Sequence, residues 1–246
     1  MKSIRNFRKE WVITTSLGYL LGFLCFILIG SIASLIAPEA IADISPANRP
    51  QQLDPANLPD WLDRSTYEAL YLHNLWQHLI MYPVFGALLG SLQSMVLKKY
   101  ILKVWPWILA SIFGFLIIIS GELIQRHLVI GPHAGPVEPI FIVLGGGGIT
   151  GIIQWYWLRT QNITAAKWLI LWISGIILGI IAAIAFLMGL GALIGDAIAF
   201  LEENAPKVAF GIELGLFGAI TGAVAGWISA KPLYQQLNKN NTGNIS

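Results

Sequence analysis

The stretch Gly147-Gly-Ile-Thr-Gly-Ile-Ile-Gln-Trp-Tyr-Trp-Leu-Arg159 is an apolar run in which glycines four residues apart precede a glutamine, aromatic residues and one arginine. A similar stretch occurs 61 positions earlier, Gly86-Ala-Leu-Leu-Gly-Ser-Leu-Gln-Ser-Met-Val-Leu-Lys98. A weaker copy, Gly218-Ala-Ile-Thr-Gly-Ala-Val-Ala-Gly226, has Ala225 where the glutamine would stand. The recurrence predicts one structural unit that the chain uses more than once.

The spacing within each copy indicates a helix-packing motif. Residues four apart lie on one face of a helix, and the glutamine continues that face one turn further on. Inside a lipid bilayer, small residues let helix backbones approach closely, and an amide side chain bonds across the interface for roughly 0.6–2 kcal/mol. A ligand contact by the two glutamines is the alternative interpretation. The packing positions that we predict are Gly86, Gly90, Gln93, Gly147, Gly151, Gln154, Gly218 and Gly222.

The composition is that of a membrane protein. The 246 residues are 56% hydrophobic and 11% charged, with a mean hydropathy of +0.68, whereas a soluble domain has roughly 25% charged residues. The net charge of +2, without a basic run away from the membrane flanks, excludes a nucleic-acid partner. The first apolar run, 11–37, exceeds the roughly 7–15 residues of a signal-peptide core, and we expect an uncleaved span there.

The apolar runs predict an all-α fold, a six-transmembrane-helix bundle in a single integral membrane domain over 1–246. A bilayer crossing needs roughly 20 apolar residues. A polar connection around the prolines between 129 and 139 separates the third run from the fourth. The expected helices cover about 11–37, 66–97, 105–124, 140–158, 168–195 and 208–230.

The repeat extends over a whole helical hairpin. Aligning 86–114 with 147–175 without a gap matches seven residues, among them Gln93 with Gln154 and Trp107 with Trp168. Trp11 is followed seven residues later by a glycine, as these two tryptophans are. Helices six and one are therefore predicted to be the two halves of a third hairpin, which is interrupted by the N- and C-termini. We predict an approximate threefold arrangement of helices 6+1, 2+3 and 4+5.

Charge asymmetry predicts the topology, since Lys and Arg collect on the cytoplasmic side. With both termini cytoplasmic, only four basic residues fall on the outer side: Arg49, Arg64, Arg126 and Lys207. The acidic, proline-rich segment 38–65 then becomes an extracytoplasmic loop, and 38–72 the surface for a protein partner. The Asn-rich stretch 238–246 reads as a disordered cytoplasmic tail. The expected location is a bacterial plasma membrane, or a thylakoid membrane in a cyanobacterium.

Ionisable residues at membrane depth are costly and mark possible sites. Glu122 and Glu213 both fall near the outer edge of their helices, by the rise of 1.5 Å per residue. His78 reaches the same layer, and Arg126 lies one turn beyond Glu122. These four residues are the candidate ligand or ion site, and interfacial carboxylates without a function are the alternative.

Catalytic, metal and cofactor signatures are missing from the sequence. It contains no His-Glu-x-x-His and no Gly-x-Ser-x-Gly. His73 and His78 are five residues apart, which places them on different sides of a helix, and Cys25 is the single cysteine. We therefore predict no catalytic residues, no metal site and no cofactor. Gly145-Gly-Gly-Gly148 lacks the strand and the Gly-Lys-Ser/Thr of a phosphate loop, and we interpret it as a flexible or closely approached point in a helix.

The Gln-Trp-x-x-Leu-Arg signature at 154–159, behind Gly147 and Gly151, resembles a motif of uncharacterised small polytopic membrane proteins of bacteria, largely cyanobacterial. The resemblance covers roughly 86–231 and implies a membrane location without an activity. The copy at 86–98 departs from the motif, with Ser94 in place of the tryptophan and Lys98 in place of the arginine.

Three functions are compatible with these features. An interaction or assembly protein is the first, because packing residues are many and polar groups in mid-membrane are few. The second is a small permease or channel with an outer polar vestibule at Glu213, Glu122 and His78. A membrane-embedded lipid-modifying enzyme is the third.

Overall fold

The computed structural model describes residues 3–35, 64–101, 103–128, 142–161, 163 and 165–243. Every regular element in these ranges is a helix, so the predicted all-α class is confirmed. The helices are α1 (Ile4–Leu35), α3 (Arg64–Leu97), α4 (Trp105–Leu128), the π-helix η2 (Ile142–Gly146), α6 (Gly147–Thr160), α7 (Ala166–Asn204) and α8 (Pro206–Gly243).

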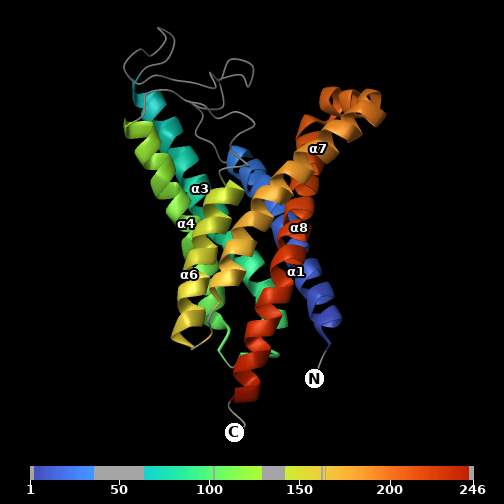
Figure 1. Cartoon of the computed structure of the whole chain (residues 1–246). Helices are drawn as coiled ribbons and strands as arrows, with labels where there is room; N and C mark the ends of the chain where they lie inside the picture. Colours follow the sequence, from blue (N-terminus) through green and yellow to red (C-terminus); the bar gives the residue numbers. More distant parts are fainter. Residues whose placement is uncertain are drawn as a thin grey trace.

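The helices pack in chain order around a closed circuit. α1 packs on α3, α3 on α4, α4 on α6, α6 on α7, α7 on α8, and α8 returns to α1. The N-terminal end of α1 and the C-terminal end of α8 lie at the same end of the bundle (Figure 1). There the Phe7 and Tyr234 rings are 5.3 Å apart. The first and last helices of the chain are therefore neighbours.

Several helices have the length and composition of membrane spans. The segments Ile4–Ile32, Leu75–Leu97, Ala166–Gly195 and Val208–Lys239 qualify, and Trp105–Ile117 is a shorter apolar helix. Their outward faces carry large exposed apolar side chains, such as Leu28, Ile181 and Phe210. Because exposed apolar surface on this scale needs a lipid environment, the chain is a membrane protein of several apolar helices.

Close backbone approach explains why glycines recur along the helix interfaces. A methyl group at Gly90 of α3 would lie 2.9 Å from the Ile108 Cα of α4. One at Gly222 of α8 would lie 2.9 Å from the Ser16 Cα of α1. These separations leave no room for a side chain without moving a backbone. At these two positions the structure therefore requires glycine.

The predicted disordered tail is wrong over 238–243, because α8 continues through Pro232 to Gly243. Proline removes one helix hydrogen bond, but Leu233 and Leu237 beyond it are buried in the core. Their packing sustains the helix past the proline. The last helix was expected to end at about 230, and this tertiary effect is the reason that it does not.

Other boundaries also differ from those expected. α1 begins at Ile4 rather than 11, since Phe7 is buried and stacks on Trp11 at 5.9 Å. The helix expected from 140 begins as a π-helix at the glycine run. α7 passes residue 195 across a kink at Ile194 (φ −130°, ψ 31°). Most of the 38–65 loop lies outside the described residues.

Candidate functional site

A layer of buried tryptophans occupies the interior near the end where the termini lie. Trp107 and Trp168 lie in the first turns of α4 and α7, Trp11 lies about two turns into α1, and all three are fully buried. The Trp11 and Trp107 rings are 6.0 Å apart, and the Trp107 and Trp168 rings are 5.5 Å apart. Tryptophans from three separate helices therefore meet in one cluster.

Buried amides connect this layer to the neighbouring helices. The indole Nε1 of Trp107 donates to Oε1 of Gln93 at 2.9 Å, and Nε2 of Gln93 donates to Oγ1 of Thr15 at 3.3 Å. Nε2 of Gln154 donates to Oγ of Ser111 at 2.9 Å. Gln93 and Gln154 both have almost no exposure. Their amide groups bond helix to helix.

The acceptors of these bonds were not predicted from the sequence. Thr15 follows Trp11 by four residues, and Ser111 follows Trp107 by four. The signal available in the sequence was a hydroxyl residue one turn after Trp11 and one turn after Trp107. Ser229, which accepts from Trp11 Nε1 at 3.2 Å, has no counterpart in the motif.

A second tryptophan on α7 binds the start of α6. Nε1 of Trp172 donates to the backbone oxygen of Gly147 at 2.9 Å. Gly147 directly follows the π-helix η2, whose backbone bonds join residues five apart instead of four. The same glycine faces the Tyr19 hydroxyl, which a methyl group at Gly147 would approach to 2.8 Å. Tyr19 of α1 therefore reaches across the bundle interior to α6.

Five buried polar side-chain atoms in this interior have no protein hydrogen-bond partner among the described residues. Buried polar atoms in proteins are otherwise almost always paired, either with protein or with ordered water. In a bilayer an unpaired one is especially costly. The five atoms are Tyr19 Oη, Thr150 Oγ1, Gln154 Oε1, Trp168 Nε1 and Thr221 Oγ1.

Two of the four candidate ionisable residues, His78 and Glu213, belong to the helices that flank α1. His78 of α3 is half-buried, 6.3 Å from the Phe26 ring and 5.5 Å from the Tyr82 ring. Glu213 of α8 is half-buried near Gly211, where a methyl group would lie 3.3 Å from Ile27 of α1. Phe26 and Ile27 are adjacent, so His78 and Glu213 lie at one level on helices flanking α1. The side chains of Glu122 and Arg126 lie outside the described part.

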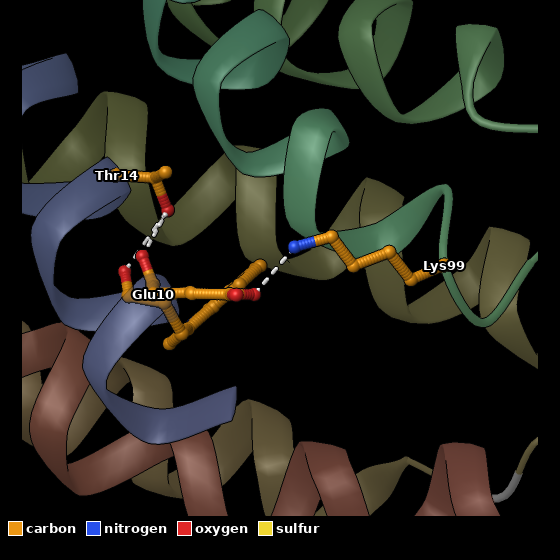
Figure 2. Close-up of polar contacts among 4 residues, drawn as sticks. Glu10, Thr14 and Lys99 are labelled. Atoms are coloured by element: carbon orange, nitrogen blue, oxygen red, sulfur yellow. Dashed lines mark hydrogen bonds and ion pairs between the residues drawn. The ribbon is translucent and has the colours of Figure 1, made fainter. Parts of the chain in front are cut away.

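An ion pair joins two helices at the end where the termini lie. Nζ of Lys99 is 2.7 Å from Oε2 of Glu10, and both side chains are about one-third exposed. Figure 2 shows this pair, together with the Thr14 hydroxyl that donates to the Glu10 backbone oxygen at 2.9 Å. The pair connects α1 to the turn after α3.

Among the residues that the structure describes, no group of three His, Cys, Asp or Glu side chains could hold a metal ion. The Cys25 thiol is half-buried and unbonded. Comparison with protein-family models, with curated proteins and with solved structures found no match for this chain.

Proposed function

We propose that the chain is a six-span bundle of three helical hairpins, α8 with α1, α3 with α4, and α6 with α7, in approximate threefold symmetry. The closed packing circuit supports this arrangement. So does the meeting of Trp11, Trp107 and Trp168, which hold the same place in their hairpins.

Equivalent glycine contacts give independent support. Gly90, Gly151 and Gly222 are aligned in the three repeats. A methyl group at each would meet the residue four after the tryptophan of the partner helix. These contacts are Ser111 Cβ at 2.9 Å, Trp172 Cδ1 at 2.6 Å and the Thr15 backbone oxygen at 2.8 Å.

The dimensions of the two shorter elements fit a crossing. α4 has 24 residues, about 36 Å at 1.5 Å per residue. The combined stretch of η2 and α6, Ile142 to Thr160, extends about 28 Å at the same rise. The hydrocarbon core of a bilayer is about 30 Å thick.

The function that this architecture supports best is interaction or assembly within a bacterial membrane, with both termini cytoplasmic. The observation on which the proposal depends is that the three tryptophans are fully buried and pack against one another in the bundle interior. Gln93 and Gln154 use their amides there for helix–helix bonds instead of lining an aqueous path. The partner-facing surface is the acidic segment 38–72, and the bacterial assignment, plasma or thylakoid membrane, follows the motif resemblance.

Cysteine labelling tests the six spans. In a Cys25→Ser background, Asn48→Cys, Ala134→Cys and Asn204→Cys should react with a membrane-impermeant maleimide from one side. Lys103→Cys, Asn162→Cys and Asn240→Cys should react only from the other. Labelling of the 134 and 103 variants from the same side would contradict a crossing by α4.

Affinity purification from native membranes tests the assembly role. The full chain should retain a defined partner that a variant lacking 45–65 loses. A variant lacking 241–246 should keep the partner, and so should Glu213→Gln. Absence of a partner, combined with a solute flux in proteoliposomes that Glu213→Gln abolishes, would contradict the assembly role.

A small permease is the second candidate, favoured by the five unpartnered polar atoms in the interior. Such atoms suit a hydrated path. Glu213 and His78, on either side of α1, would then stand near its outer end. This function predicts flux through reconstituted protein and its loss in Glu213→Gln.

A further inference from the structure

The end of the bundle that carries the termini has a large excess of positive charge. Of the described acidic residues, only Glu10 belongs to this end, and its carboxylate is bound by Lys99 at 2.7 Å. Ten basic residues of the described part belong to the same end. They are Arg5, Arg8, Lys9, Lys98, Lys99, Lys103, Arg159, Lys167, Lys231 and Lys239.

Arg8 differs from the other cations at this end. Its side chain is half-buried, and its Nε is enclosed without a protein hydrogen-bond partner among the described residues. Its guanidinium carbon lies 5.6 Å from the centroid of the Trp227 ring. That distance is within the range of a cation–π contact, which holds the guanidinium plane against the indole.

The seam between α1 and α8 brings two further cations to this place. Trp11 bonds to Ser229, and a methyl group at Gly226 would lie 3.1 Å from the Val12 Cα, so the helices are antiparallel and in close contact. Arg5 is one turn from Arg8, and Lys231 is one turn from Trp227. In an antiparallel pair these two turns point toward the same end. Both side chains are exposed.

The setting of this cluster is a membrane boundary. Arg8 belongs to the apolar segment Ile4–Ile32, and Trp227 belongs to Val208–Lys239. Trp227 is 59% exposed on the outside of the bundle, as tryptophans of the interfacial belt are. Cationic side chains on the cytoplasmic side of spanning helices bind anionic lipid head groups.

We propose that Arg8, with Arg5, Lys231 and the indole of Trp227, forms a binding site for the phosphate of an anionic phospholipid. The guanidinium donates to the phosphate oxygens in the fork geometry that arginine provides. Arg5 and Lys231 add charge, and Trp227 packs against the glycerol and the first acyl carbons. This inference does not depend on the assembly role or on the number of spans.

Native mass spectrometry of the full chain in micelles, with phosphatidylglycerol or phosphatidylcholine added at equal concentration, tests the site. Wild-type protein should retain phosphatidylglycerol preferentially. Arg8→Gln should reduce that retention about tenfold, the effect of losing one or two charge-assisted hydrogen bonds. Arg159→Gln is the matched control, because Arg159 lies 5.9 Å from the Trp155 ring at the same end but is exposed.

If Arg8→Gln does not fold, Lys231→Gln provides the test, because Lys231 is exposed and its replacement should not disturb the packing. Lys231→Gln should lower phosphatidylglycerol retention about threefold, by loss of one surface charge near the phosphate. Equal losses in Arg8→Gln and Arg159→Gln would show non-specific attraction and overturn the proposal. Equal retention of the two lipids would also overturn it. Displacement of the lipid by millimolar inorganic phosphate alone would assign the site to a free anion and not to a lipid.

Discussion

The indole of Trp107 donates a 2.9 Å hydrogen bond to Gln93, whose amide in turn donates to Thr15 at 3.3 Å. One buried side chain of α3 thereby bonds to α4 on one side and to α1 on the other. Gln154 holds the aligned position in α6, but among the described residues its side chain bonds only to Ser111 of α4, at 2.9 Å. The two glutamines therefore differ in how many helices they connect.

We expect Gln93→Leu to lower the free energy of unfolding by about 1–3 kcal/mol, because it leaves the Trp107 and Thr15 groups without their bonds. Gln154→Leu should cost less, since it removes one bond and also removes an oxygen that has no partner within the described part of the chain. Unfolding of both variants by SDS titration in mixed micelles measures the difference. An equal or larger loss in Gln154→Leu would contradict this ranking.

Glycine substitutions separate packing positions from open ones. Gly90→Ala places a methyl group 2.9 Å from the Ile108 Cα, so the helices must move apart. We expect a loss of about 1–3 kcal/mol, as for other overpacked interiors. The control is Gly189→Ala on α7, where a methyl group meets open space; a gain of about 0.4–1 kcal/mol is expected there from reduced chain entropy. A similar loss at both positions would refute the close-packing interpretation.

The helical class could be predicted from the apolar runs and the low charge, because in lipid the backbone must bond within its own segment. The glycine positions Gly90 and Gly222 were also identifiable, since the motif repeats at a spacing with a packing reason. The residues that contact them could not be identified from the sequence. That Gln93 bonds to Thr15, 78 residues away, depends on how the hairpins meet.

The helical tail shows why local composition was insufficient. The Asn-rich stretch after Leu237 has low helix propensity, and Pro232 precedes it. Local sequence alone therefore predicts that the helix ends early. The structure continues because Leu233 and Leu237 are buried and Tyr234 packs on Phe7. Phe7 belongs to the opposite end of the chain, so no local pattern contains this contact.

The adjacency of α1 and α8 predicts that a circular permutant folds. The permutant begins at Ala166, runs through α7 and α8, crosses a flexible linker of about ten Gly and Ser residues to Ser3, and ends at Gln161. Both new ends stay on the side where the original ends lie, so the topology is conserved. Size-exclusion behaviour and thermal unfolding in micelles should match those of the original chain.

Co-expression of the two fragments 1–161 and 166–246 is the control for the permutant, because it has the same break without the new join. If the fragments assemble and the permutant does not, the proposed third hairpin of α8 and α1 is incorrect. If both assemble, the join is compatible with the native packing.

The Glu10–Lys99 ion pair should contribute little to stability. Both side chains are about one-third exposed, although the contact is short at 2.7 Å. Exposed pairs contribute about 0.2–1 kcal/mol and are screened by salt. Lys99→Gln should therefore lower the free energy of unfolding by less than about 1 kcal/mol, and the difference should shrink between 50 mM and 500 mM salt. A larger effect that is independent of salt would mean that the pair is shielded from water.

The buried hydroxyl of Tyr19 distinguishes a dry interior from a hydrated one. It has no protein partner among the described residues and lies against Gly147. In a dry interior, Tyr19→Phe removes an unsatisfied polar group and should be neutral or stabilising by up to about 1–3 kcal/mol, the desolvation penalty of that group. The control is Trp107→Phe, which removes a paired donor and should destabilise the protein. If Tyr19→Phe instead destabilises it by more than about 1 kcal/mol, the hydroxyl is bonded to water. The bundle interior is then wet, and the permease gains support over the assembly protein.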